Sequence, residues 1–340
     1  MQRNKLNLNP LLLCTALLFA TILLLTGCTI NNKVVSSTKT NNQGNLSSDD
    51  NKPTQNVGIK DGQSLKTESF IDLNHGWIVN AHSIFDTEDG GLHWAKIVDI
   101  NGDIYDMDFL SLTQGWLSSS EGLLKTADGG KTWININKVK GKIVTRLQFV
   151  DEKHGWIYAY NVDKNENPNY YFMRTTDGGE KWLSIEIPDP DFFGILAFSF
   201  ISPTQGWAIS GSQPGAGSQP KKLYKTTDGG ISWDKISSTS IPPSKSDGLP
   251  MGGYVSDLCF LNEKYGWFTE SRGQLFVTSN GGKNWTMVDN HPVKEWFMSK
   301  PFFVDRSEGY VLNFESGRNS LLITKDGGLN WKQVYPYRRG

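Results

Sequence analysis

The sequence predicts an all-β protein folded as a β-propeller of six four-stranded blades. One octapeptide pattern, Thr-x-Asp/Asn-Gly-Gly-x-x-Trp, occurs six times between residues 87 and 331. A phenylalanine precedes each copy, and seven residues after it comes an aromatic residue that follows a glycine. The stretches between these markers alternate apolar and polar residues, which is typical of short half-buried strands. Units this small cannot enclose a core alone, so we expect them to pack in a ring, with seven blades as the alternative.

Each unit contains four predicted strands. One strand ends at the phenylalanine, the second starts at the Gly-aromatic pair, and the third and fourth enter and leave the octapeptide. The phenylalanines are Phe70, Phe109, Phe149, Phe200, Phe260 and Phe303. The aromatic residues after glycine are Trp77, Trp116, Trp156, Trp207, Trp267 and Tyr310.

The octapeptide is expected to form the turn between the third and fourth strands. Its glycines adopt positive φ angles without steric cost, and the side chain before them can accept backbone N–H groups, with local support from the threonine. These side chains are Asp89, Asp128, Asp177, Asp228, Asn280 and Asp326. The tryptophans that close the pattern, expected to be buried, are Trp94, Trp133, Trp182, Trp233, Trp285 and Trp331. Six copies related by rotation cannot all face one substrate, so we expect a structural role.

The octapeptide resembles the Asp box, or bacterial neuraminidase repeat, of sialidases, sortilin-type receptors and some glucanases. The fuller unit, with Phe-aliphatic-Asp before Gly-Trp and then Thr-x-Asp-Gly-Gly-x-x-Trp, is most similar to the photosystem II stability and assembly factor family over residues 66–335. This resemblance implies a propeller that acts as an assembly or binding factor. Plant and cyanobacterial members are described as seven-bladed with an arginine-rich patch, whereas this chain has six repeats and scattered arginines.

The N-terminal segment is expected to be a lipoprotein signal peptide, residues 1–27. Arg3 and Lys5 precede an uncharged apolar run, Leu11 to Leu25, that suits a secretory signal. The run ends in Leu25-Thr26-Gly27-Cys28, which resembles the lipobox of bacterial lipoproteins and implies lipidation of Cys28. An uncleaved anchor is the alternative. We therefore expect a protein anchored by lipid to the cell membrane on its extracytoplasmic side.

Residues 28–65 are expected to form a disordered tether, and residues 66–340 the propeller. The tether is rich in Asn, Ser, Thr, Lys and Asp and cannot bury enough apolar surface to offset its ordering entropy. Cys14 lies in the signal segment and Cys28 carries the lipid, so Cys259 stands alone and no disulfide is expected.

Composition and motifs exclude several function classes. Without Arg3 and Lys5 the chain has 32 basic and 35 acidic residues, a net charge of −3, and no basic block, which argues against nucleic acid as a partner. No Cys/His cluster or Gly-rich phosphate loop occurs at a useful spacing, so neither a metal nor a cofactor is expected. His75 and His154 share one position before Gly-Trp, which suits a turn.

Loop lengths indicate which side of the ring carries function. Thr87 lies 10 positions after Trp77, whereas Thr175 lies 19 positions after Trp156. Because strands alternate in direction, the variable connections share one face of the ring, and insertions collect on the binding face of repeat proteins. Aromatic residues within or beside these loops are candidate binding residues: Tyr170, Tyr171, Phe192, Phe193, Trp296 and Phe297. The alternative for each is packing between blades.

We therefore expect a non-catalytic propeller that binds a protein partner or a cell-envelope polymer. A carbohydrate-active hydrolase of sialidase-like architecture is the alternative, and a purely structural scaffold is a third option. A sialidase-like site needs an arginine cluster, but Arg146, Arg174 and Arg306 fall on different elements. Asp106 and Asp108 share one face of an innermost strand, where a solvated channel wall is favoured over a calcium site.

Overall fold

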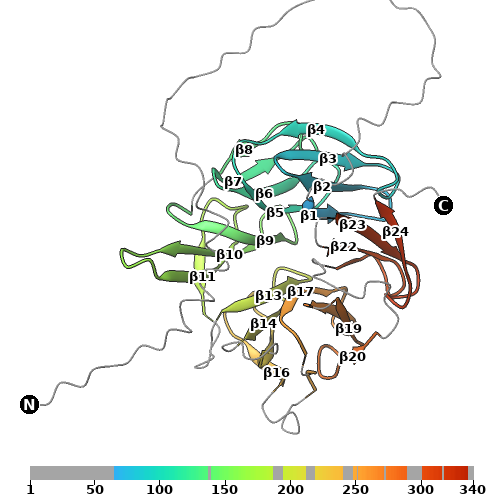
Figure 1. Cartoon of the computed structure of the whole chain (residues 1–340). Helices are drawn as coiled ribbons and strands as arrows, with labels where there is room; N and C mark the ends of the chain where they lie inside the picture. The colour runs from blue at the N-terminus through green and yellow to red at the C-terminus, as the bar shows by residue number, and fades with distance from the viewer. Residues whose placement is uncertain are drawn as a thin grey trace, which may run out of the picture. The chain divides into compact units, whose positions relative to one another are not determined.

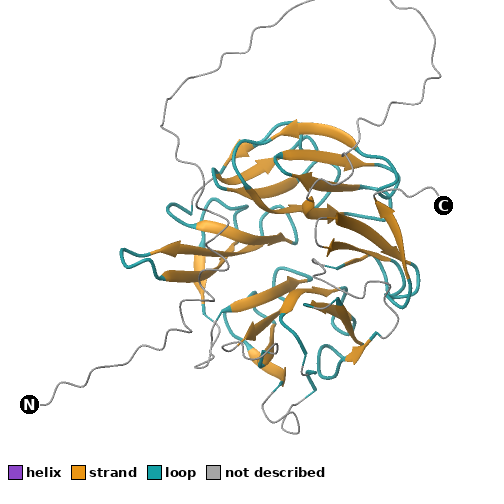
Figure 2. Cartoon of the chain, viewed as in Figure 1, coloured by secondary structure: helices purple, strands orange, loops and turns teal. Residues whose placement is uncertain are grey.

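The computed structural model describes residues 65–136, 139–186, 194–211, 219–239, 248–250, 252–271, 273–288, 301–315 and 318–335. These residues form twenty-four strands in six antiparallel sheets of four, with the first strand of each innermost (Figures 1 and 2). The predicted six four-stranded blades are confirmed. No helix in this part of the chain is long and apolar enough to span a bilayer. Cys28 and the other residues of the predicted signal peptide and tether up to residue 64 lie outside the described ranges.

The sheets are called blades 1 to 6 in chain order. Blade 1 contains β1 (Leu65–Phe70), β2 (Gly76–Asn80), β3 (Ser83–Thr87) and β4 (Ala95–Asp99). Blade 2 contains β5 (Ile104–Phe109), β6 (Gly115–Ser119), β7 (Gly122–Thr126) and β8 (Ile134–Asn135). Blade 3 contains β9 (Ile143–Phe149), β10 (Gly155–Val162), β11 (Pro168–Thr175) and β12 (Leu183–Ile185).

The second half of the ring repeats this order. Blade 4 contains β13 (Ile195–Phe200), β14 (Gly206–Gly211), β15 (Lys221–Thr226) and β16 (Asp234–Ser238). Blade 5 contains β17 (Val255–Phe260), β18 (Gly266–Glu270), β19 (Gln274–Thr278) and β20 (Thr286–Met287). Blade 6 contains β21 (Phe302–Phe303), β22 (Gly309–Glu315), β23 (Arg318–Thr324) and β24 (Trp331–Tyr335).

A three-ring aromatic unit joins each pair of neighbouring blades. The aromatic residue after glycine in one blade stacks on the phenylalanine of the next, as in Trp156 on Phe200 at 3.5 Å between ring centroids. The octapeptide tryptophan meets the same phenylalanine edge-on, as in Trp233 and Phe200 at 6.1 Å. The other stacked pairs are Trp77–Phe109, Trp116–Phe149, Trp207–Phe260, Trp267–Phe303 and Tyr310–Phe70. The aromatic side chains bury a large apolar area at each junction and therefore hold neighbouring blades together.

The octapeptide turn has the predicted hydrogen bonds in all six blades. In blade 3, the Thr175 hydroxyl donates to Oδ1 of Asp177 at 2.9 Å and accepts the backbone N–H of Gly179 at 2.9 Å. Oδ1 of Asp177 also accepts the backbone N–H of Lys181 at 2.9 Å. The first glycine, Gly178, has φ +78°, and a Cβ there would lie 2.8 Å from the carbonyl oxygen of Glu152. The side chain before the glycines therefore shapes the turn, as expected.

Candidate functional site

The alternating strands give the ring two faces. The Asp-box face carries the turn between the first and second strands of each blade and the octapeptide between the third and fourth. The insertion face carries the connection between the second and third strands and the link from the fourth strand to the next blade. Every connection of variable length therefore ends on the insertion face, which makes it the candidate functional site.

The most extended described feature of the insertion face is the hairpin of β10 and β11 in blade 3. These strands pair over eight positions, from Gly155 with Thr175 to Val162 with Pro168, and the hairpin protrudes from the ring (Figure 1). Its tip is closed by Asp163, whose Oδ1 accepts the backbone N–H groups of Asn165 and Asn167 at 2.7 and 2.9 Å. The hairpin is thus an ordered β-structure that extends from the blade.

Three tyrosines lie together on one side of this hairpin. The rings of Tyr158 and Tyr170 are parallel, with centroids 5.7 Å apart, and Tyr160 lies 6.1 Å from Tyr170. Tyr158 packs against the core between blades 3 and 4, and burial raises the pKa of its hydroxyl far above the usual range. Tyr170 remains 51% exposed. We call Tyr158, Tyr160 and Tyr170 the tyrosine cluster.

The predicted binding residues have different environments. Tyr170 is exposed, whereas Tyr171 points to the other side of the hairpin and packs against the core between blades 2 and 3. The Lys142 ammonium lies 4.4 Å from the centroid of the Tyr171 ring. Phe192, Phe193, Trp296 and Phe297 lie outside the described residues. Sequence reasoning missed Tyr158 and Tyr160, although the alternating segment "IYAYNV" places both on one side of β10.

The innermost strands meet through polar side chains. The Arg146 guanidinium on β9 pairs with Asp257 on β17, two blades away, and donates to the carbonyl oxygen of Ser256 at 2.6 Å. Burial opposes the charge of Arg146, but the carboxylates of Asp257 and Asp106 raise its pKa. Asp106 and Asp108 accept the backbone N–H groups of Leu147 and Phe149 at 2.8 and 2.7 Å. These two carboxylates therefore join blades 2 and 3 along the axis of the ring.

The described residues contain no group of three or more His, Cys, Asp or Glu side chains arranged to hold a metal ion. The carboxylate oxygens of Asp106 and Asp108 accept backbone N–H groups instead.

A buried ion pair joins blades 4 and 5 near the insertion face. Lys221, at the start of β15, pairs with Glu270, at the end of β18, and both side chains are fully buried. The Lys221 ammonium also donates to the carbonyl oxygen of Gly253 at 3.2 Å. Burial lowers the pKa of Lys221, while the charge of Glu270 opposes this shift. Through its bond to Gly253, Lys221 therefore fixes the last residues of the link between β16 and β17 onto the blade.

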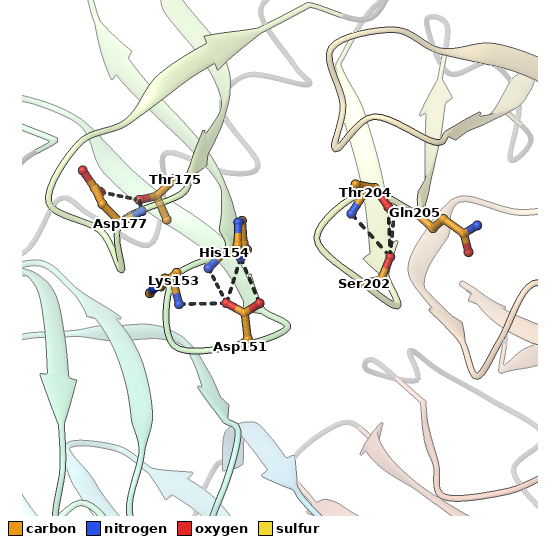
Figure 3. A network of polar contacts seen from close by, with 8 residues as sticks. All are labelled: Asp151, Lys153, His154, Thr175, Asp177, Ser202, Thr204 and Gln205. Carbon is orange, nitrogen blue, oxygen red and sulfur yellow. Dashed lines mark hydrogen bonds and ion pairs between the residues drawn. The ribbon is translucent and has the colours of Figure 1, made fainter.

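Figure 3 shows short polar turns of blades 3 and 4, which lie on the Asp-box face. In blade 3, Oδ1 of Asp151 accepts the backbone N–H of His154 at 2.7 Å, and Oδ2 lies 2.8 Å from Nδ1 of the same histidine. In blade 4, the Ser202 hydroxyl accepts the backbone N–H of Gln205 at 3.0 Å. His75 and Asp72 repeat the first arrangement in blade 1. The turn role expected for both histidines is thus confirmed.

The three arginines considered for a sialidase-like site each contact a different part of the molecule. Arg146 pairs with Asp257 among the innermost strands. Arg174 donates to the carbonyl oxygen of Asp228 at 3.2 Å, in the octapeptide of blade 4. The guanidinium of Arg306 lies 4.1 Å from the centroid of the Tyr265 ring on the Asp-box face. Each arginine is therefore engaged in its own contact.

Comparison with known proteins identifies relatives of similar sequence. No protein-family model matches the chain. Over 141 residues, 41% of its length, it is 31% identical to the photosystem II assembly lipoprotein Ycf48 of Synechococcus sp. (strain CC9902). Over 151 residues, 43% of its length, it is 26% identical to the chloroplastic photosystem II stability/assembly factor HCF136 of Oryza sativa subsp. japonica. The matches span 34% and 30% of these proteins, about a third of each.

Solved structures share the propeller fold at low sequence identity. A luciferin-regenerating enzyme has a TM-score of 0.53 at 10% identity, covering 78% of this chain and 91% of that one. A gluconolactonase from Xanthomonas campestris has a TM-score of 0.51 at 12% identity, covering 77% and 86%. A structure of YCF48 bound to D1 peptide has a TM-score of 0.49 at 17% identity, covering 82% and 84%. The fold is a β-propeller with six four-stranded blades, and part of the chain is similar in sequence to photosystem II assembly factors.

Proposed function

We propose that the chain is a non-catalytic propeller that binds a protein partner through its insertion face, with the tyrosine cluster as a contact surface. The observation that carries the proposal is the half-exposed Tyr170 ring, held by Tyr158 and Tyr160 on an extended hairpin. Tyrosine side chains provide large contact area at low entropic cost and are enriched where partners bind. A ring already positioned by two neighbours loses little conformational freedom on binding.

The sequence relatives support a protein partner. Both are named as assembly factors of photosystem II, and one is named as a lipoprotein. We carry over to this chain the general role of an assembly factor, which is to bind another protein, and the lipid anchor at Cys28. The insertion face would then act on the extracytoplasmic side of the cell membrane. A cell-envelope polymer is the alternative ligand of the same face.

Site-specific photocrosslinking tests the insertion face. A photoreactive residue replaces Tyr170 in one variant of the full chain, and Ile231 in a matched control. Ile231 is 62% exposed and lies in an octapeptide, on the Asp-box face. In native membranes we expect one defined protein adduct from position 170 and none from position 231. Equal adducts from both positions, or only glycan adducts from position 170, would contradict a protein-binding insertion face.

The lipid anchor and the hydrolase alternative have separate tests. Cys28→Ser should release the protein from membranes, and unchanged retention would contradict lipidation at Cys28. For catalysis, the purified protein is assayed against a panel of sialosides and β-glucans. Turnover that disappears on replacing one insertion-face carboxylate would establish the hydrolase instead.

A further inference from the structure

A cavity of about 360 Å³ opens on the Asp-box face between blades 5 and 6, opposite the insertion face. Tyr265 and Arg306 line it from the first turns of the two blades. Asn280 and Asn284 line it from the octapeptide of blade 5, and Asp326 from that of blade 6. This is also the junction at which the octapeptide departs from the repeat, because Asn280 replaces the aspartate of the other five copies.

The Arg306 guanidinium lies at the cavity, over the Tyr265 ring and 4.1 Å from its centroid. Among the described residues it makes no hydrogen bond or ion pair. The adjacent carboxylates are engaged elsewhere. Oδ1 of Asp305 accepts the backbone N–H of Glu308 at 2.8 Å, and Glu308 lies 3.8 Å from the Lys325 ammonium. Stacking on an aromatic face orients the guanidinium while leaving its N–H groups open at the edge.

Asn280 replaces a carboxylate oxygen with an N–H donor at the same cavity. Its Oδ1 accepts the Thr278 hydroxyl and the backbone N–H of Asn284, both at 3.0 Å, as an aspartate Oδ1 does in the other copies. The amide nitrogen must therefore occupy the position of the second oxygen. In the blade 2 copy that second oxygen, Oδ2 of Asp128, accepts the Thr132 hydroxyl at 2.6 Å. Blade 5 thus presents an N–H group where the other copies present negative charge.

The carboxylate of Asp326, which also lines the cavity, already has hydrogen-bond partners. Oδ1 of Asp326 accepts the Thr324 hydroxyl at 2.9 Å and the backbone N–H of Asn330 at 2.8 Å. Its Oδ2 accepts the side-chain amide of Asn330 at 2.8 Å. The first turn of blade 5 also carries an amide, Asn262, where blades 1, 3 and 6 carry aspartate. The cavity therefore combines open donors with a locally reduced negative charge.

We propose that this cavity binds a carboxylate-bearing ligand the size of a monosaccharide or an amino acid, with the carboxylate held by Arg306 and Asn280. A planar guanidinium matches a carboxylate in two parallel hydrogen bonds, and such charge-assisted bonds are the strong ones. A cavity of about 360 Å³ is at the small end of ligand sites. A uronic acid and the C-terminal residue of a peptide share this chemistry.

Matched acid and neutral ligands test the carboxylate requirement. Binding to the full-length protein in detergent is measured by calorimetry for glucuronate against glucose, and for N-acetylglycine against its amide. We expect at least one acid to bind and both neutral analogues to fail. Binding of glucuronate alone would assign an acidic sugar as the source, and binding of N-acetylglycine alone a peptide terminus. Failure of both acids would overturn the proposal.

Two variants test the residues. Arg306→Met retains an apolar chain over Tyr265 but removes the guanidinium, and Asn280→Asp restores the carboxylate that the other copies carry. Each should weaken acid binding about tenfold or more, because each removes a charge-assisted or complementary contact. Lys153→Met, an exposed lysine on the same face of blade 3, is the control and should leave binding unchanged.

Asn280→Asp is expected to fold normally, because five copies of the turn already contain aspartate. A urea unfolding midpoint equal to that of the parent protein confirms this. Unchanged acid binding in both variants would overturn the proposal, as would an equal loss in Lys153→Met.

Discussion

The ring of Tyr310 in blade 6 stacks on Phe70 in blade 1, with centroids 4.2 Å apart, and its hydroxyl donates to the carbonyl oxygen of Leu73 at 2.7 Å. At the equivalent junction of blades 3 and 4, the Trp156 indole donates to the carbonyl oxygen of Gly229 at 3.1 Å. Each blade consists of four consecutive strands, so no strand is shared between blades 1 and 6. Side-chain contacts such as these therefore close the ring.

Tyr310→Phe should lower the free energy of unfolding by about 1 kcal/mol at pH 8, because it removes one buried hydrogen bond and keeps the stack. Urea unfolding measures the change. Tyr254→Phe, at a more exposed tyrosine, is the control and should be close to neutral. Equal stability of Tyr310→Phe and the parent protein would show that this hydroxyl contributes nothing to closure.

The same tyrosine should make stability depend on alkaline pH. Burial, with the nearby carboxylates of Asp72 and Glu308, raises the pKa of Tyr310 from 10.0 to about 12. The folded state therefore favours the neutral hydroxyl. Its contribution is complete below about pH 10, where the unfolded group begins to ionise, and is lost as pH rises to about 12. Tyr310→Phe should show a shallower loss of stability than the parent protein over this interval in urea titrations.

Much of the fold could be predicted because the repeat encodes local structure. The stacked residues Trp156 and Phe200 are both conserved positions of the repeated pattern. Six copies of the pattern therefore predict six equivalent junctions. The ion pairs could not be predicted. Arg146 and Asp257 are 111 residues apart, and Lys221 and Glu270 are 49 apart, in strands whose alternation gives no sign of pairing.

The candidate site was predicted only in part, because side-chain direction decides exposure. Tyr170 and Tyr171 are adjacent in a strand, so one faces solvent while the other packs between blades. Loop length correctly pointed to the insertion face as the variable one. The pairing of Tyr160 on β10 with Tyr170 on β11 adds Tyr160 to the tyrosine cluster, and loop length alone gives no sign of this pairing.

Gly178→Ala should destabilise the protein more than Gly141→Ala. Both glycines have positive φ, +78° and +70°, so alanine strains the backbone at either position by about 1–2 kcal/mol. At Gly178 the added Cβ would also meet the carbonyl oxygen of Glu152 at 2.8 Å, whereas at Gly141 nothing lies within 4 Å. Urea unfolding of the two variants isolates the cost of this close approach. Equal losses of stability in the two variants would mean that the Asp151–His154 turn and the octapeptide of blade 3 can move apart at no energetic cost.

Thr132→Val should raise the pKa of Asp128. The Thr132 hydroxyl is the main cause that holds this pKa at about 2, followed by the backbone N–H of the same residue. A lowered folded pKa stabilises the fold above the unfolded value near 4, and this contribution is lost as pH falls toward 2. NMR titration of the Asp128 carboxyl carbon measures the shift. Thr132→Ser keeps a hydroxyl and should retain the low pKa, and a raised pKa in both variants would point to the Thr132 methyl group instead.

Lys221→Met should destabilise the protein by about 3–5 kcal/mol, because it leaves the buried Glu270 carboxylate without its ion partner. The double variant Lys221→Met with Glu270→Leu should recover most of this loss, since replacing both charges removes the desolvation penalty. Lys66→Met is the control: Lys66 pairs with the largely exposed Asp103 at 3.1 Å, so its loss should cost no more than about 1 kcal/mol. Urea unfolding of the three variants completes the comparison. If Lys221→Met and Lys66→Met cost the same, water must reach Glu270, and the link ending at Gly253 would not be fixed to the blade by this pair.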